Sequence, residues 1–330
     1  MNNTRFDTTC IGNAIVDVLS RIDDDFLTQE NLVKNSMNLI DEARAEDLYS
    51  KMGSAVEISG GSAGNTAAGV ASLGARSNYI GKVRNDQLGA IFAHDIRATG
   101  VNFETKMSEQ GAATARSFVL ITPDAHRTMN TYLGACIELG PDDIDPEIIA
   151  ASAVTYMEGY LWDPDGGKAA FRKAAKISHE ADQRVSLTLS DSFCVDRFRD
   201  EFIEFIDGGV DILFANEDEI KSLYQTDSLE VAIDIVRDKV EIACVTRSSE
   251  GSVILQGDTT VEVTADRSID VEDTTGAGDL YAAGFLYGFT KGRSLAESGA
   301  IASIAAAEVI SHIGARPAEN LKDLIASRMG

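Results

Sequence analysis

The sequence is poor in the features that mark secreted or membrane-spanning chains. Its 330 residues include 4 cysteines and no C-x-x-C pair: Cys10, Cys136, Cys194 and Cys244. No apolar run approaches the ~18 residues that a spanning helix needs. The chain begins Met1-Asn2-Asn3-Thr4, without a basic-then-apolar leader. These absences predict a protein of the reducing cytoplasm that is not embedded in a membrane.

Basic residues are also scarce. Lys and Arg total 29 against 53 Asp and Glu, which gives a formal net charge of −24 at pH 7. Proteins that bind nucleic acids or anionic membranes need basic patches, so neither partner is expected, and any anion site must be local. The histidines are scattered without the spacing of metal ligands, and we interpret them as surface or packing residues: His94, His126, His179 and His312.

Proline is rare as well, with 5 in the chain, and no linker or internal repeat divides the sequence. A chain of this length that is 44% hydrophobic can bury a large core, in one large α/β domain or two smaller ones. Short apolar runs alternate with helical patterns, which is typical of a parallel sheet covered on both faces. The predicted strands are 8–12, 77–81, 154–157, 185–189, 210–215 and 242–246, and the predicted helices are 65–73, 88–99, 167–182, 217–224, 229–238, 277–290 and 295–311. Residues 15–40 and 103–132 break the alternation and are predicted as short β segments and turns.

The most informative motif is Asp273-Thr274-Thr275-Gly276-Ala277-Gly278-Asp279. It precedes a predicted helix, so the N–H groups of Gly276, Ala277 and Gly278 are expected to be unpaired first-turn donors that face an anion. Such a nest favours a phosphate, or the charge that develops as a phosphoryl group is transferred. Asp279 could then accept the proton of an attacking hydroxyl. The alternative is a glycine-rich start of a helix whose aspartate complements the helix dipole.

A second motif lies about 210 residues earlier, at 59–74, and begins Ser59-Gly60-Gly61-Ser62-Ala63-Gly64-Asn65. The string Gly81-Lys82-Val83 and then Asp86-Gln87-Leu88-Gly89 follow it. The two motifs closely resemble the signatures of the ribokinase-like (PfkB) carbohydrate and nucleoside kinases, and the resemblance covers nearly the whole chain. It implies one three-layer α/β/α domain over 1–330, with a mostly parallel central sheet and a small β lid from about 15–40 and 103–132. It also implies ATP-dependent phosphoryl transfer.

The same resemblance implies sites for ATP and metal ions. Asn216 and Glu219 match the family's N-x-x-E motif and are implied to hold Mg²⁺, mainly through water; acids in a first helical turn are also ordinary partners of the helix dipole. Residues 246–251 resemble the nucleotide loop, with Ser248 where glycine is usual, and Arg247 could neutralise phosphate charge or cap a strand. The implied ATP contacts are Asn216, Thr246, Arg247, Gly251, Thr274, Gly276 and Gly278. Asp273 and Thr275 mark a possible site for a monovalent cation such as K⁺.

On the substrate side, Asn13 and Asp17 lie around the exit of the first strand. The resemblance implies that Asp17 binds sugar hydroxyls, together with the backbone of Gly60 and Gly61 and with Asn65. A buried polar site of this kind discriminates strongly, because a substrate without the hydroxyl leaves its partners unpaired. An aspartate there is equally typical of a turn. In the predicted lid, Arg127 either reaches the transferred phosphoryl group on closure or is a solvated arginine.

The acceptor is indicated by three strings, 12–17, 24–27 and 189–193, which resemble adenosine kinases more than ribokinases or fructokinases. In adenosine kinases, the residue matched by Phe193 packs against the purine, a kind of contact that contributes roughly 1–3 kcal/mol. The alternative for Phe193 is core packing. We therefore expect the 5′-hydroxyl of adenosine as acceptor, with ribose, fructose or 2-keto-3-deoxygluconate as alternatives. A monomer or homodimer is expected.

Other classes fit the sequence less well. Residues 60–64 also satisfy the G-x-S-x-G of α/β-hydrolases, with His312 downstream, but 54–58 is a poor buried strand and the 273–279 motif would stay unexplained. The first strand is not followed by the G-x-G-x-x-G of a dehydrogenase, and a Walker A motif is absent. A non-catalytic ligand sensor on the same fold remains an alternative, because fold alone does not imply activity. The presence of Asp279, Gly276 and Gly278 argues against it.

Overall fold

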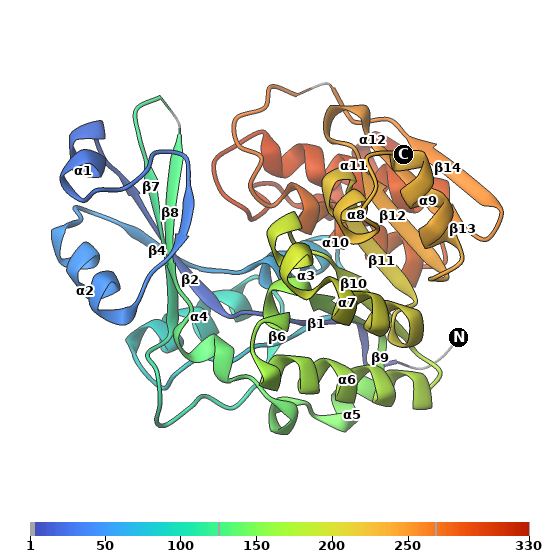
Figure 1. The fold of residues 1–330 in the computed structure, drawn as a ribbon, viewed down its shortest axis with the longest axis horizontal. Helices are drawn as coiled ribbons and strands as arrows, with labels where there is room; N and C mark the ends of the chain where they lie inside the picture. Colours follow the sequence, from blue (N-terminus) through green and yellow to red (C-terminus); the bar gives the residue numbers. More distant parts are fainter. Residues whose placement is uncertain (1–3, 125, 268, 330) are drawn as a thin grey trace.

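The computed structural model describes residues 4–124, 126–267 and 269–329, which form two β-sheets flanked by helices (Figure 1). The larger sheet has nine strands in the order β14-β13-β12-β11-β10-β9-β1-β5-β6. Pairing is parallel from β12 to β6, and β13 and β14 add an antiparallel edge, which confirms the mostly parallel sheet. The strands are β1 Phe6–Ile11, β5 Ser77–Ile80, β6 Asn102–Phe103, β9 Ser152–Glu158, β10 Arg184–Thr188, β11 Ile212–Asn216, β12 Ile242–Thr246, β13 Ser252–Gln256 and β14 Thr259–Val263.

Helices cover both faces of this sheet. One face is covered by α3 Ser62–Ser72, α4 Gln87–Ala98, α10 Ala277–Thr290 and α11 Leu295–Ile310. The other is covered by α5 Pro146–Ala150, α6 Asp165–Glu180, α7 Ser192–Gly209, α8 Glu217–Leu223 and α9 Leu229–Arg237. The last helix, α12 Leu321–Met329, packs against α3 and α11. Short 3₁₀ turns occupy Gly134–Glu138, Pro141–Asp143, Gly159–Trp162 and Ser248–Glu250. All seven predicted helices are confirmed to within three residues at each end.

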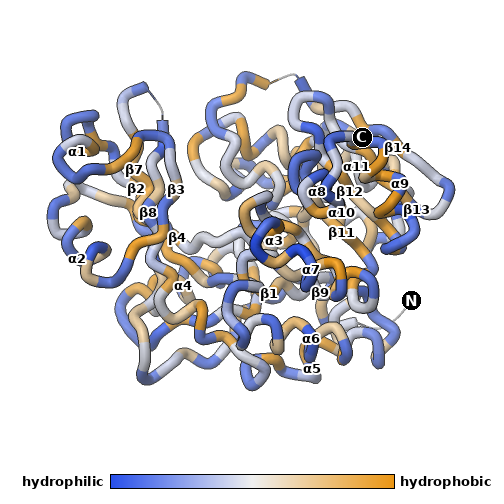
Figure 2. Tube along the Cα trace, in the orientation of Figure 1, coloured by the Kyte–Doolittle hydropathy of each residue, from blue (hydrophilic) through white to orange (hydrophobic). Residues whose placement is uncertain are grey.

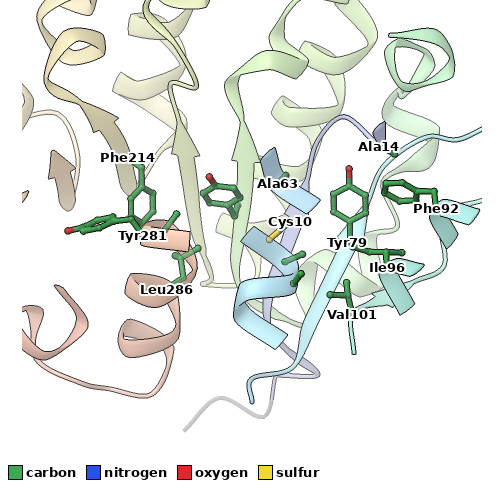
Figure 3. Close-up of a cluster of buried hydrophobic side chains, with 14 of the residues drawn as sticks. Cys10, Ala14, Ala63, Tyr79, Phe92, Ile96, Val101, Phe214, Tyr281 and Leu286 are labelled. Atoms are coloured by element: carbon green, nitrogen blue, oxygen red, sulfur yellow. The ribbon is translucent and has the colours of Figure 1, made fainter. Parts of the chain in front are cut away.

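The core lies on both sides of the large sheet because successive side chains of a strand point to opposite faces. Cys10 belongs to the cluster beneath α3 and α10, whereas Ile11 belongs to the cluster beneath α6 and α7. Tyr156 and Met157 of β9 divide in the same way. Figure 3 shows the first of these clusters, in which Tyr281 of α10 takes part. A strand buried on both faces has a nearly continuous apolar sequence, so six strands could be predicted from the sequence.

The smaller sheet stands beside the large one, at the left of Figure 1, in the order β3-β8-β7-β2-β4. Its strands are β2 Ile15–Arg21, β3 Met37–Leu39, β4 Val56–Gly60, β7 Ala115–Ile121 and β8 Arg127–Tyr132, and it carries α1 Asp24–Gln29 and α2 Glu42–Lys51. Figure 2 shows apolar segments in its strands beside the polar residues of α1 and α2.

The predicted bounds of this sheet need two corrections. Strand β4 belongs to it although it lies outside 15–40, and residue 103 instead ends β6 of the large sheet. Strand β4 is an edge strand with Val56 62% exposed, so it lacks the apolar run of a buried strand. Helix α7 was also not predicted, because non-helical backbone at Phe198 (φ −124°) kinks it and interrupts the apolar period. No helix in the described part of the chain is both long enough and apolar enough to span a bilayer.

Candidate active site

The two glycine-rich motifs meet at Asp279. Ser62 Oγ of α3 donates a hydrogen bond of 2.6 Å to Asp279 Oδ1, and Asn65 Nδ2 donates one of 2.9 Å to Asp279 Oδ2. Burial raises the pKa of Asp279 above its ordinary value, whereas these two bonds and the charge of Arg316 lower it. A carboxylate held by two donors at the junction of two helices has a fixed orientation, as a general base requires.

The loop before Asp279 needs glycine at its first position. Gly276 precedes α10 with φ 81°, in the left-handed region, and a Cβ there would lie 2.9 Å from Cα of Ala315. Ala277 and Gly278 follow in the first turn of α10, whose N–H groups have no partner within the helix. Ala277 N–H donates instead to the carbonyl oxygen of Thr274 at 3.2 Å, so it is not the unpaired donor that the sequence predicted. Gly276, Ala277, Gly278 and Asp279 all line one cavity of about 830 Å³. The predicted anion nest therefore opens into a space large enough for a nucleotide.

The rest of the lining of this cavity includes the carboxyl ends of β10 to β12, the segment before α10 and one side of α11. Of the predicted ATP contacts, Asn216, Thr246, Gly251 and Thr274 line it as well. Arg247 is not part of the lining, and its Nη2 lies 3.9 Å from Glu262 Oε2. The lining instead includes Arg267, which the sequence did not single out.

The loop at residues 246–251 keeps a glycine-like geometry despite its serine. Ser248 has φ 49°, in the left-handed region, at the position where the resembled family has glycine. Gly251 has φ 91°, and a Cβ there would lie 1.9 Å from the carbonyl oxygen of Val263. The loop therefore retains its tight approach to β14, with backbone strain at Ser248.

Asn216 and Glu219 form a capping box at the start of α8. Glu219 Oε2 accepts from Asn216 N–H at 2.9 Å, Glu219 Oε1 accepts from Asn216 Nδ2 at 2.7 Å, and Asn216 Oδ1 accepts from Glu219 N–H at 2.8 Å. These residues therefore have the local role at the start of a helix that the sequence allowed as an alternative to metal binding. Both residues also face the cavity. Burial raises the pKa of Glu219 to about 7, and no ion pair to it is found within the described ranges.

On the substrate side, Asp17 lies against the diglycine turn. A Cβ on Gly60 would be 2.2 Å from Asp17 Oδ2, and Gly61 has φ 85° where the chain enters α3. Burial raises the pKa of Asp17 to about 7, although Arg316 and Arg127 lower it. Asn13 Oδ1 and Asn65 Oδ1 are buried and have no hydrogen-bond partner in the described part of the chain. Buried acceptors without donors are costly, so these two oxygens are available to accept hydrogen bonds from a ligand.

Arg127 connects the small sheet to the glycine loop. Its Nη1 lies 2.5 Å from Asp273 Oδ2 and donates to Thr275 Oγ1 at 3.3 Å, while its Nη2 is buried without a partner in the described residues. It is therefore not a solvated arginine. Phe193, in the first turn of α7, is 70% exposed, so the core-packing alternative for this ring is wrong. Its ring is covered in part by Arg197, whose guanidinium carbon lies 5.4 Å from the ring centre.

Two charged residues beside the site were missed by sequence reasoning. Glu158, at the end of β9, accepts from the N–H of Asn13 at 2.8 Å and of Ala63 at 2.7 Å, and burial raises its pKa to about 7. Arg316 donates to the carbonyl oxygens of Ser59 and Gly64. Neither belongs to the motifs quoted above, although a Glu that ends a predicted parallel strand could have been noticed from its position.

These features fit a phosphotransferase: a carboxylate held by two donors at Asp279, a glycine loop before a helix, a nucleotide-sized cavity and a cluster of buried polar groups beside it. Residues 31–321 match the pfkB family carbohydrate kinases. The chain belongs to this family and is an ATP-dependent kinase, so the hydrolase, dehydrogenase and ligand-sensor alternatives fall away.

Several relatives resemble the whole chain. An adenosine kinase from Sinorhizobium meliloti is 53% identical with a TM-score of 0.91, over 98% of this chain and 99% of its own. A probable sugar kinase protein from Rhizobium etli CFN 42 is also 53% identical with a TM-score of 0.91, over 98% of both chains. The adenosine kinase of Saccharomyces cerevisiae is 27% identical over 92% of this chain and 94% of its own length. The chain therefore resembles both nucleoside and sugar kinases.

Proposed function

We propose that this protein transfers the γ-phosphoryl group of ATP to the 5′-hydroxyl of adenosine. The observation that carries the proposal is the position of Asp279, which lines the nucleotide-sized cavity and accepts a hydrogen bond from Asn65, whose own Oδ1 is buried without a partner among the described residues. Asp279 takes the hydroxyl proton as the acceptor oxygen bonds to the γ-phosphorus and the bond to ADP breaks. The N–H groups of Gly276 and Gly278 stabilise the charge that develops on the phosphoryl oxygens.

The small sheet favours a nucleoside over a free sugar. In its register, Asp17 stands opposite Ile58 and Ser117, and the next row on the same face joins Val56, Leu19, Val119, Met129 and Met37. Met37 is 49% exposed and Val56 62% exposed. An apolar row beside a hydroxyl-binding aspartate suits a ligand with a sugar at one end and an apolar face at the other. We further propose that Phe193 supplies an aromatic contact to the base.

Asn216 and Glu219 fit a hydrated Mg²⁺. Each of their side-chain oxygens accepts one protein hydrogen bond, which leaves a lone pair for water, and the buried Glu219 lacks a cationic partner in the described ranges. Mg²⁺ retains much of its water and suits such indirect contacts. A bound Mg²⁺ would offset the charge of the ATP phosphates during transfer.

A monovalent cation at Asp273 fits less well. Asp273 Oδ1 accepts from Thr275 N–H and Thr275 Oγ, and Oδ2 accepts from Gly314 N–H and faces Arg127. We propose that Arg127 supplies positive charge here and that K⁺ binds well once Arg127 has left. A cytoplasmic location is also proposed, because all four cysteines are buried and free.

A panel of acceptors tests the proposed function. Adenosine, ribose, fructose and 2-keto-3-deoxygluconate are each assayed for ADP release with ATP and Mg²⁺. We expect kcat/KM for adenosine to exceed that for any free sugar by about 100-fold or more. Comparable values for one of the sugars would overturn the nucleoside assignment and favour a sugar kinase, the second candidate, which the likeness to the Rhizobium etli protein supports.

A further inference from the structure

Arg316 is a half-buried arginine whose guanidinium the proposed mechanism does not use. It lies in the segment between α11 and α12, and within the described residues no carboxylate oxygen lies within ion-pair distance of it. Its hydrogen bonds go to neutral groups. Nε and Nη2 donate to the carbonyl oxygen of Ser59 at 3.1 and 2.8 Å, Nη2 donates to Ser59 Oγ at 3.0 Å, and Nη1 donates to the carbonyl oxygen of Gly64 at 2.5 Å. Removing a charge from water without an adjacent counter-ion costs free energy, so the position of Arg316 calls for an explanation.

These bonds fix the segment that carries the acceptor site. Ser59 belongs to β4, one residue before Gly60, which lies against the Asp17 carboxylate, and Gly64 lies in the first turn of α3 beside Asn65. Asp95 of α4 accepts from both Ser59 N–H and Ser59 Oγ, at 2.7 and 2.6 Å. The turn from the small sheet into α3 is therefore held from two sides, by Asp95 and by Arg316.

The same short segment also contacts the phosphate side. Gly314 N–H donates to Asp273 Oδ2 at 3.1 Å, and Ala315 lies so close to Gly276 that a Cβ on Gly276 would be 2.9 Å from its Cα. Gly314 and Ala315 thus contact the glycine loop, and Arg316 contacts the turn that leads into α3. This segment therefore fixes the position of the acceptor side of the site relative to the phosphate side.

The charges around Arg316 are mostly negative. Asp17 and Asp279 each act on the guanidinium, and Asp17 and Asp279 repel each other. The other charged groups near these carboxylates are Asp95, Glu158 and Arg127, and the nearby tyrosines Tyr79, Tyr156 and Tyr160 have raised pKa values and stay neutral. Arg127 is already paired with Asp273, whereas Arg316 has no carboxylate within ion-pair distance among the described residues and its charge lowers the pKa of both Asp17 and Asp279.

We propose that Arg316 is a positioning residue for the phosphoryl transfer: its fork holds the acceptor turn Ser59–Gly64 against the glycine loop, and its charge favours the ionised forms of both Asp17 and Asp279. The inference rests on the proposed function, in which Asp279 is the base and Asp17 binds the acceptor. The two parts of the role are separable, because a lysine retains the charge but cannot reproduce the planar fork.

The test compares Arg316→Met, Arg316→Lys and a matched control, Ser72→Ala. The control removes the bond of 3.0 Å from Leu321 N–H to Ser72 Oγ, which ties the start of α12, just after the Arg316 segment, to α3 without changing a charge. For Arg316→Met we expect the acid limb of the pH profile of kcat/KM to move up by about one pH unit. For Arg316→Lys we expect that limb to stay in place while KM for the acceptor rises about ten-fold. Ser72→Ala should change melting temperature alone.

Two further measurements, melting temperature and hydrogen exchange, do not depend on catalytic turnover. Without Arg316 the pKa values of Asp17 and Asp279 rise further, so the melting-temperature deficit of Arg316→Met should grow from pH 5 to pH 8. Hydrogen exchange over 59–66 should speed up in both Arg316 variants and not in Ser72→Ala. A constant deficit at every pH, or an unmoved acid limb in Arg316→Met, would overturn the inference. If Arg316→Met does not fold, an acid limb that moves in Arg316→Lys would overturn it equally. A wild-type protein that phosphorylates no acceptor would instead defeat the proposed function and leave these two readouts valid.

Discussion

At the scale of single residues, Asp279 combines burial with two fixed donors. Replacing it by Asn preserves the size of the side chain and an oxygen for Ser62 or Asn65, but removes the base. Turnover with adenosine should fall by roughly 10²–10⁴-fold. ATP affinity and melting temperature should hold or rise, since a buried negative charge beside the phosphates has gone. All three quantities are measured on one purified variant, and near-wild-type turnover would end the assignment of Asp279 as the base.

Ser248 offers a second test at this scale. Its φ of 49° costs a residue with a Cβ about 1–2 kcal/mol, whereas glycine loses more entropy on folding, by about 0.5–1 kcal/mol. Ser248→Gly should therefore raise the free energy of unfolding by about 0.5–1 kcal/mol. Chemical denaturation measures this change. The matched control, Gly251→Ser, should destabilise, because a Cβ there meets the Val263 carbonyl oxygen at 1.9 Å. Destabilisation by both changes would contradict this account.

At the scale of elements, strand β8 brings Arg127 to the glycine loop. In Arg127→Ala, the Asp273 carboxylate loses its cationic partner. Turnover should fall, and added K⁺ should restore part of it, whereas the wild type should respond weakly to K⁺. Activity titrations with KCl against a bulky organic cation measure the difference. Arg21→Ala is the control, because Arg21 lies in the same row of the small sheet but is exposed. Equal responses to K⁺ in wild type and Arg127→Ala would contradict the proposal.

Helix α7 carries one phenylalanine that we propose to contact the ligand, Phe193, and another that packs in the core, Phe202. Phe193 is 70% exposed, so Phe193→Ala should raise KM for adenosine with little change in melting temperature. Phe202, on the same helix, is fully buried, and Phe202→Ala should cost about 3–5 kcal/mol of stability. Kinetics and thermal melts on both variants check this contrast. An unchanged KM in Phe193→Ala would remove Phe193 from the acceptor site.

At the scale of the whole molecule, stability should depend on pH through buried acids. Burial raises the pKa values of Asp17, Glu158 and Glu219 to about 7, so each keeps a proton in the folded chain where the unfolded chain has lost it. The free energy of unfolding should therefore fall as pH rises from about 4.5 to about 7. Asp7 acts in the opposite sense, because its pKa of about 2 gives stability that is lost as pH falls toward that value.

Denaturant unfolding between pH 5 and pH 8 measures this loss. Glu219→Gln is the matched variant, because it removes one of the three titrating groups and should flatten the pH dependence. Stability that stays constant over this interval would show that the three carboxylates ionise at their ordinary pKa values in the folded protein, and would contradict the prediction. Binding of Mg²⁺ and ATP beside Glu219 should make ionisation of the carboxylates less unfavourable. The free energy of unfolding should then change less with pH in their presence.

The sequence by itself determined the elements whose signals are local. A parallel strand buried on both faces has a continuous apolar run, and a long amphipathic helix has a regular period, so the central sheet and the helices after its strands could be predicted. Likewise, glycines before a helix with an adjacent Asp predict an anion nest from neighbouring residues alone. In contrast, β4 and α7 depended on context, one as an exposed edge strand and the other because of its kink at Phe198.

Only the tertiary structure decided which distant residues share the site. The bonds of Asp279 to Ser62 and Asn65 join residues more than 200 positions apart, and those of Arg316 to Ser59 and Gly64 span 250 or more. The pairing of Arg127 with Asp273 likewise depends on where the small sheet places β8. No periodicity or spacing encodes such contacts, because each is set by the packing of whole elements. The chemistry was therefore readable from the motifs, whereas the charges that tune it were fixed by the fold.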